Sequence, residues 1–226
     1  MDRQTFFSDF SHSKIICILR NVPAEKVIPV SEALYRGGIR FLEVAFHMSS
    51  PRALTETACT IQKLRDFWGD SYHIGAGTVL TVEQADAARD AGAEYIFSPN
   101  TETDIIKHTK KLGLISIPGA FTPSEILAAH NAGADIVKIF PASALSPQYI
   151  KELTAPFPHI PVIAVGGIHE GNLTAFLKAG CIGAGIGSAL LNHETLDSSD
   201  YGVLYEKASA YAAMIRIFQE QTGACL

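Results

Sequence analysis

A short glycine-containing turn, followed at once by an apolar run, recurs along this 226-residue chain. Glycine readily adopts the left-handed conformation in which a helix often ends before the chain enters a strand. Thr81-Val82-Glu83-Gln84 and Thr122-Pro123-Ser124-Glu125 have the form of capping boxes and therefore mark helix starts. The turns are Arg36-Gly37-Gly38, Ala91-Gly92-Ala93, Leu112-Gly113, Ala132-Gly133-Ala134 and Ala179-Gly180.

Eight apolar runs are candidate strands, and each is followed by a helical pattern. Strict alternation of strand and helix predicts a parallel sheet. Eight such units favour an α/β fold of the closed (β/α)8 TIM-barrel type over an open doubly wound sheet, because about 250 residues is typical of the barrel. We expect residues 1–226 to form one barrel domain, with residues 1–12 as a short N-terminal helix outside it. The runs begin near Lys14, Arg40, His73, Glu94, Leu114, Asp135, Pro161 and Cys181.

Charge and composition exclude several classes of partner. The net charge of -5 offers no basic face for nucleic acid, and no apolar stretch reaches the roughly 20 residues that span a membrane. The N-terminus lacks a signal-peptide pattern, so we expect a cytoplasmic protein. The four cysteines are widely spaced and form no CxxC or Cys/His cluster, so we expect neither a disulfide framework nor a structural metal site. A small molecule is the expected ligand.

Glycine-rich turns raise the possibility of dinucleotide binding. The turns at residues 75–77 and 183–187 follow strand-like runs, but Leu80 and Ser188 occupy the place of the third glycine in the G-x-G-x-x-G fingerprint. The incomplete fingerprint argues against a dinucleotide.

One charge, Lys138, interrupts the apolar run from Ile136 to Pro141. Burial disfavours an ammonium ion and lowers the pKa of the lysine toward that of a neutral, nucleophilic amine. The alternative is a lysine on an edge strand that extends its amine to solvent.

Glu43 is the second ionisable residue in a buried pattern. Alternation places Phe41, Glu43 and Ala45 on one face of their strand, toward the barrel interior, where Lys138 can also point. An amine and a carboxyl group in one dry cavity suit imine formation, in which the carboxyl group moves protons. The alternative is a buried ion pair with a structural role.

The last two strands end in glycine-rich loops, Gly166-Gly167 and Gly187-Ser188. Loops at these positions commonly bind phosphate in barrels, because their N–H groups and the following helix favour an anion. The alternative is that these glycines only turn the chain. Arg20 and Thr78 end two other strands at the same rim, where Arg20 is equally consistent with a carboxylate clamp and with a surface arginine.

Several of these segments together resemble the signatures of the 2-keto-3-deoxy-6-phosphogluconate (KDPG) and 4-hydroxy-2-oxoglutarate (KHG) aldolases, in order and at the expected separations from about residue 13 to about residue 190. They are Leu42-Glu43-Val44, Gly75-Ala76-Gly77-Thr78-Val79-Leu80, Ser98-Pro99, Pro118-Gly119, Val137-Lys138-Ile139-Phe140-Pro141-Ala142 and Val165-Gly166-Gly167-Ile168.

The resemblance implies a class I aldolase, a cofactor-free homotrimeric lyase with a (β/α)8 barrel, that cleaves KDPG to pyruvate and glyceraldehyde 3-phosphate. The resemblance also implies KHG, cleaved to pyruvate and glyoxylate, as a second substrate. By this resemblance Lys138 forms the Schiff base and Glu43 is the general acid and base. Substrate contacts are implied for Arg20, Thr78, Pro99, Phe140, Gly166, Gly167, Gly187 and Ser188.

Two residues depart from the phosphogluconate pattern. His47 stands where several members have an arginine, so carboxylate recognition must depend more on Arg20 and Thr78. Val165 stands where those members have a threonine, and the branch that cleaves the C4 epimer, 2-keto-3-deoxy-6-phosphogalactonate, typically carries valine there. That epimer is therefore the alternative substrate.

Other functions remain open at this point. A phosphosugar isomerase or synthase could use the same phosphate loops without an imine. A metal-dependent class II aldolase is disfavoured because the eight histidines are scattered. A non-catalytic sugar-phosphate-binding barrel would not need both Lys138 and Glu43.

Overall fold

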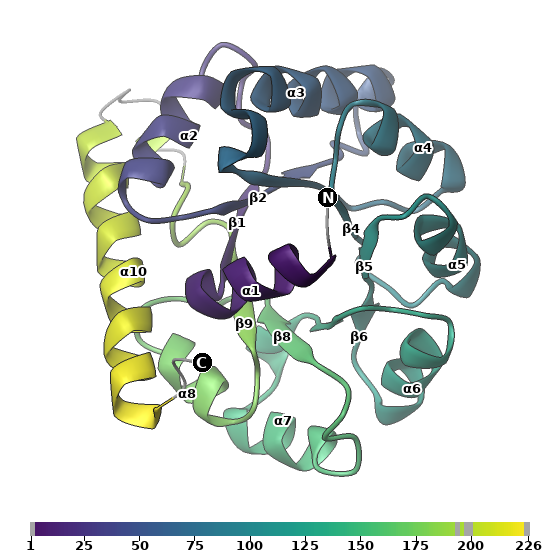
Figure 1. The fold of residues 1–226 in the computed structure, drawn as a ribbon, viewed down its shortest axis with the longest axis vertical. Coiled ribbons are helices and arrows are strands. Elements are labelled where there is room, and N and C mark those ends of the chain that lie inside the picture. Colours follow the sequence, from purple (N-terminus) through teal and green to yellow (C-terminus); the bar gives the residue numbers. More distant parts are fainter. Residues whose placement is uncertain (1–2, 193–194, 197–200, 224–226) are drawn as a thin grey trace.

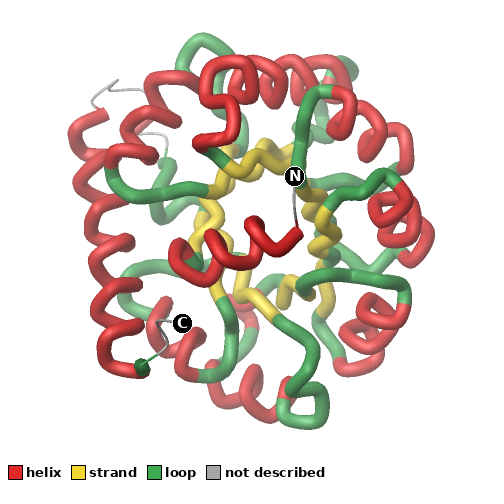
Figure 2. Tube along the Cα trace, in the orientation of Figure 1, coloured by secondary structure: helices red, strands yellow, loops and turns green. Residues whose placement is uncertain are grey.

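The computed structural model describes residues 3–192, 195–196 and 201–223 and shows a ring of parallel strands surrounded by helices (Figures 1 and 2). The strands are β1 (Ile15–Leu19), β2 (Phe41–Ala45), β3 (His73–Gly77), β4 (Tyr95–Phe97), β5 (Ile115–Ile117), β6 (Gly119–Ala120), β7 (Val137–Ile139), β8 (Val162–Val165) and β9 (Gly183–Ile186). The helices are α1 (Arg3–Ser13), α2 (Val27–Arg36), α3 (Ala53–Trp68), α4 (Val82–Asp90), α5 (Thr103–Lys111), α6 (Pro123–Asn131), α7 (Pro147–Thr154), α8 (Leu173–Lys178) and α10 (Tyr201–Thr222).

The strands confirm the predicted (β/α)8 barrel. Their order is β5-β4-β3-β2-β1-β9-β8-β7-β6, and all recorded pairings are parallel. The strands β5 and β6 are two halves of one predicted strand, separated at Pro118, which has no N–H to donate. The N–H groups of Asp135 and Lys138 donate to the carbonyls of Ser116 (2.9 Å) and Pro118 (2.8 Å), and these bonds close the ring.

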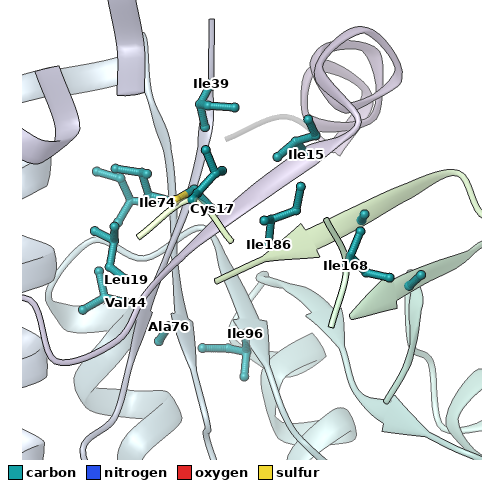
Figure 3. Close-up of a cluster of buried hydrophobic side chains, with 14 of the residues drawn as sticks. Ile15, Cys17, Leu19, Ile39, Val44, Ile74, Ala76, Ile96, Ile168 and Ile186 are labelled. Atoms are coloured by element: carbon teal, nitrogen blue, oxygen red, sulfur yellow. The ribbon is translucent and has the colours of Figure 1, made fainter. Parts of the chain in front are cut away.

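The predicted helix starts and strand faces are also confirmed. Thr81 and Thr122 both form complete capping boxes. On β2, Phe41 belongs to the cluster inside the barrel, whereas Leu42 and Val44 belong to the cluster between strands and helices. Figure 3 shows part of this outer cluster, to which β1, β2 and β3 contribute alternate side chains.

The N-terminal helix α1 does more than precede the barrel. It lies across the end of the ring at which the strands begin (Figure 2). Phe6 and Phe10 are fully buried, and the centroids of both rings lie 5.2 Å from that of Phe41. The helix therefore closes this end of the barrel and completes its interior core.

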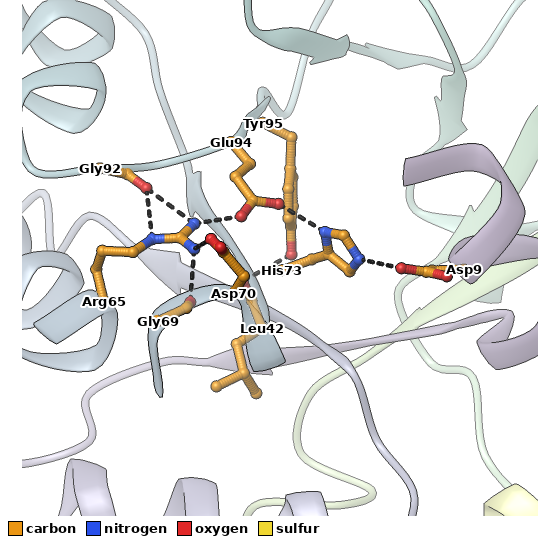
Figure 4. A network of polar contacts seen from close by, with 9 residues as sticks. All are labelled: Asp9, Leu42, Arg65, Gly69, Asp70, His73, Gly92, Glu94 and Tyr95. Atoms are coloured by element: carbon orange, nitrogen blue, oxygen red, sulfur yellow. Dashed lines mark hydrogen bonds and ion pairs between the residues drawn. The ribbon is translucent and has the colours of Figure 1, made fainter. Parts of the chain in front are cut away.

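A network of polar contacts lies at this closed end (Figure 4). His73 Nδ1 lies 2.6 Å from Glu94 Oε2, and His73 Nε2 lies 2.9 Å from Asp9 Oδ2 on α1. Arg65 also pairs with Glu94. Burial by itself would lower the pKa of His73, but the hydrogen bonds to Glu94 and Asp9 outweigh it and raise that pKa.

The described residues contain no helix that is long and apolar enough to cross a membrane. Within the same part of the chain, no group of three or more histidine, cysteine, aspartate or glutamate side chains is arranged to hold a metal ion.

Candidate active site

Lys138 lies on β7 and points into the barrel, with 6% of its surface exposed. Its Nζ atom is 4.4 Å from the ring centroid of Phe140 and 4.9 Å from that of Phe97. Burial lowers the pKa of the amine, Arg20 lowers it further, and Glu43 opposes both effects. The alternative of an amine extended to solvent is therefore wrong, since this nitrogen is buried against two aromatic rings.

Glu43 on β2 is 1% exposed, and its Oε2 atom has no hydrogen-bond partner. Burial raises the pKa of the carboxyl group, while Lys138 and Arg20 lower it by a smaller amount. A buried polar atom without a partner is rare in proteins, because its desolvation is not compensated. Glu43 is therefore available to exchange a proton with a group that enters the cavity.

A glycine on the neighbouring strand, two residues beyond the one that pairs with Glu43, makes room for its carboxyl group. A Cβ atom on Gly77 of β3 would lie 1.6 Å from Glu43 Oε1, so a side chain cannot be accommodated there without displacing the carboxyl group. Gly75, on the same strand, makes room for the ring of Tyr95 in the same way, at 2.3 Å. The hydroxyl of Tyr95 donates to the carbonyl of Leu42 at 2.6 Å.

Lys138 and Glu43 are not an ion pair. None of the ion pairs found among the described residues joins them, although each changes the pKa of the other. The alternative of a buried pair that locks the barrel is therefore not supported. The amine is therefore a weakened base and the carboxyl group a weakened acid, with no ion pair between them.

Both side chains line a cavity of about 540 Å³ at the end of the barrel where the strands finish. This size is within the range of small-molecule sites. The cavity brings together eight of the ten residues that the sequence singled out. They are Arg20, Glu43, Lys138, Phe140, Gly166, Gly167, Gly187 and Ser188.

The other two residues, Thr78 and Pro99, are not among those lining this cavity. Thr78 follows Gly77 directly and has a φ of +59°, an uncommon conformation for a β-branched residue. The carbonyl oxygen of Pro99 packs against β6, where a Cβ atom on Gly119 would lie 2.2 Å away.

The loop after β8 is held in a defined shape by its neighbours. Gly166 and Gly167 have φ angles of +94° and +70°, which favour glycine. The carbonyl of Gly166 accepts from the N–H of Ser143 (2.9 Å), and the side chain of Asn172 donates to the carbonyl of Gly167 (2.9 Å). Asn172 also accepts from the N–H of His169 (2.8 Å).

Sequence reasoning missed several residues at this site. Asn21, His169 and Asn192 line the cavity, and Asn172 braces its loop. They lie in connections without a recognisable motif, and their positions relative to the strand ends depend on the closed barrel. Of the two departures noted above, Val165 lines this cavity, but His47 lines a neighbouring one between α2 and α3.

Comparisons with known proteins agree with this geometry. The family model of the KDPG and KHG aldolases matches residues 8–206. The chain is 39% identical to the 2-dehydro-3-deoxy-6-phosphogalactonate aldolase of Escherichia coli (strain K12), over 78% of this chain and 83% of that protein. It is 32% identical to the 2-dehydro-3-deoxy-phosphogluconate aldolase of Treponema pallidum (strain Nichols), over 87% and 91% of the two chains.

Solved structures are similar as well. A native KDPGal structure has a TM-score of 0.82 and 35% identity, with 91% of this chain and 96% of that chain covered. A KDPG aldolase from Legionella pneumophila, with pyruvate captured as a covalent carbinolamine intermediate, has a TM-score of 0.79 and 28% identity, with 90% and 96% covered.

Proposed function

Because this chain belongs to the KDPG and KHG aldolase family and is a class I aldolase, a lyase, we propose that it cleaves a 2-keto-3-deoxy-6-phosphosugar acid into pyruvate and glyceraldehyde 3-phosphate. The proposal assigns the covalent step to Lys138 and the proton transfers to Glu43. Its main support is the burial of both groups in one cavity without an ion pair between them.

Lys138 is the proposed nucleophile. Its neutral Nζ attacks the C2 ketone of the substrate to give a carbinolamine, which loses water to form an iminium ion. The iminium ion then accepts the electron pair of the C3–C4 bond as that bond breaks. The C4 hydroxyl loses its proton and becomes the aldehyde of glyceraldehyde 3-phosphate, while an enamine of pyruvate remains on Lys138.

Glu43 is the proposed proton carrier. It accepts the proton from the C4 hydroxyl and returns a proton to C3 of the enamine, after which water hydrolyses the iminium ion and releases pyruvate. A carboxyl group suits both directions when its pKa is raised toward neutrality, and burial moves the pKa of Glu43 in that direction. The unpartnered Oε2 is free for these transfers.

The remaining predicted residues are proposed to bind the two ends of the substrate. The N–H groups of the two glycine-rich loops, with Ser188, suit the phosphate. Arg20 suits the carboxylate, because a guanidinium group forms two parallel hydrogen bonds with it. Thr78, Pro99 and Phe140 are assigned to the pyruvoyl end by family resemblance.

Of the two C4 epimers, we favour 2-keto-3-deoxy-6-phosphogalactonate. Val165 lines the cavity and brings no hydroxyl to the sugar chain, and the Escherichia coli relative of 39% identity is named for that epimer. KDPG remains the second candidate, because the Treponema pallidum relative is a phosphogluconate aldolase. Comparing kcat/KM for the two purified epimers decides between them. A higher value for KDPG would reverse our order.

Trapping with borohydride tests the covalent step. Incubation with pyruvate and sodium borohydride should attach a reduced pyruvoyl group to Lys138, identified by peptide mass spectrometry. Lys138→Arg should abolish the adduct, whereas Lys151→Arg, on the exposed face of α7, should not. An adduct on another lysine, or none in the unmodified protein, would refute the proposed mechanism.

The quaternary structure is proposed on family resemblance alone. We propose a homotrimer, and sedimentation equilibrium at several protein concentrations measures the mass directly. A monomer or dimer at all concentrations would contradict it.

A further inference from the structure

Two side chains outside the family signatures, His169 and Asn192, line the cavity together with Gly166, Gly187 and Ser188. His169 lies in the loop after β8, and Asn192 in the segment after β9. They therefore enter the cavity from the same two connections as the glycine-rich loops. Both are polar, and neither has a role in the imine chemistry proposed above.

The hydrogen bonding of His169 defines its tautomer. The backbone N–H of Gly171 donates to His169 Nδ1 at 3.1 Å, so this nitrogen carries a lone pair. The proton of the neutral ring must then be on Nε2. No described residue accepts a hydrogen bond from this Nε2–H group. A Cβ atom on Gly171 would lie 3.1 Å from His169 Cε1, so the ring also packs closely against this turn. His169 is thus a donor held in place by its own loop.

Asn192 is held in a comparable way. Its Oδ1 accepts from the backbone N–H of Thr195 (2.9 Å) and lies 3.0 Å from the Thr195 hydroxyl. The Thr195 hydroxyl in turn accepts from the N–H of Asn192 (3.2 Å). With the oxygen occupied, the amide plane is fixed and the Nδ2–H₂ group has no acceptor among the described residues. Asn192 is a second oriented donor at the same cavity.

We propose that His169 and Asn192 donate hydrogen bonds to the phosphate group of the substrate and thereby set the preference for phosphorylated over unphosphorylated aldehydes. The physical reason is that donors whose acceptor atoms are already occupied favour an anion, which can only accept. The inference rests on the proposed function, because it takes the phosphosugar acid to be the substrate. It adds two specificity-determining side chains to the backbone N–H groups of the loops.

The condensation direction gives a test that separates phosphate recognition from imine chemistry. Each variant is supplied with pyruvate and either glyceraldehyde 3-phosphate or D-glyceraldehyde. His169→Ala should raise KM for glyceraldehyde 3-phosphate about 10-fold, as expected for one lost hydrogen bond to an anion. Asn192→Asp keeps the oxygen that Thr195 binds but replaces the donor by a negative charge, so it should raise that KM about 30-fold. Neither should change kcat/KM for D-glyceraldehyde by more than about twofold.

His159→Ala is the matched control, since His159 is exposed and lies before β8, at the opposite end of the barrel. This substitution should leave KM unchanged for both aldehydes. Asn192→Ala provides a second variant without the added charge if Asn192→Asp fails to fold. Equal losses with both aldehydes, or unchanged KM for glyceraldehyde 3-phosphate in folded variants, would overturn the inference. A lack of the pyruvate adduct in the unmodified protein would instead overturn the proposed function. A protein that forms the adduct but does not prefer the phosphorylated aldehyde would overturn the phosphate assignment alone.

Discussion

The two ends of the barrel treat buried charge in opposite ways. Where the strands begin, charged groups are paired: His73 lies between Asp9 and Glu94, and Asp135 contacts both Arg3 (2.9 Å) and Lys110 (2.6 Å). Where the strands end, the amine of Lys138 and the carboxyl group of Glu43 are also buried, and both face one cavity without an ion pair between them. An ion pair stabilises the charged forms of its two members. Burial without a pair instead lowers the pKa of the Lys138 amine and raises the pKa of the Glu43 carboxyl group.

This difference between the two ends of the barrel has a functional consequence. An ion pair at the strand ends would keep the lysine protonated and unreactive, and an unpaired charge at the strand starts would only destabilise the fold. In TIM barrels the strand ends carry catalysis and the strand starts contribute stability. We therefore expect substitutions at the two ends to separate activity from stability.

The largest effect is expected from Lys138→Met. Removing the proposed nucleophile should lower kcat/KM for cleavage by at least about 10⁴-fold, as for other covalent nucleophiles. Because an isolated buried amine is replaced by an apolar side chain, the free energy of unfolding should rise by about 1 kcal/mol. Steady-state kinetics and urea denaturation measure the two quantities. A large loss of stability would show that Lys138 stabilises the fold, and the contrast between the two ends would fail.

Asp135→Ala tests the opposite end. Asp135 Oδ2 accepts from the buried N–H of Ser116 at 2.8 Å and also contacts Lys110. Its loss should lower the free energy of unfolding by about 3 kcal/mol and leave kcat/KM within about twofold. Asp90→Ala, which removes an exposed pair with Arg89, is the control and should cost less than about 0.5 kcal/mol. A selective loss of activity in Asp135→Ala would contradict the assignment of this end to stability.

Two glycines on β3 allow an effect on catalysis to be separated from an effect on stability within one strand. Gly77→Ala should displace the carboxyl group of Glu43 and lower kcat by about 100-fold. Gly75→Ala should instead clash with the Tyr95 ring and lower the free energy of unfolding by about 2 kcal/mol, with a smaller effect on kcat. Kinetics and thermal unfolding of the two variants separate these outcomes. Equal effects on kcat would argue against a specific role for the position of Glu43.

The smallest effects are expected in the pH dependence. In the proposed mechanism the uncharged amine of Lys138 reacts, so the acid limb of pyruvate trapping should follow the pKa of Lys138. Glu43 raises this pKa and Arg20 lowers it. Glu43→Gln should therefore move the acid limb to lower pH, and Arg20→Gln should move it to higher pH. Trapping rates with borohydride across a pH series measure both. Shifts of the same sign would show that the two charges do not act on the amine directly.

Local patterns account for most of what the sequence predicted correctly. Helix caps at Thr81 and Thr122 depend on residues three positions apart, and the inward directions of Glu43 and Lys138 follow from the two-residue period of a strand. The prediction of eight strands was confirmed for the same reason. It did not anticipate the break at Pro118, although the missing N–H of proline provided a signal.

The alternation of strands and helices can be recognised in the amino-acid sequence, and it predicts both the barrel and the end at which the polar residues gather. Three features depend on tertiary packing: α1 closes the other end through Phe6 and Phe10, Lys138 and Glu43 form no ion pair, and Gly77 leaves room for the carboxyl group of Glu43. Direction along a strand is set by neighbouring peptide units. Distance across a barrel depends on the packing of every side chain in the ring, which no local pattern records.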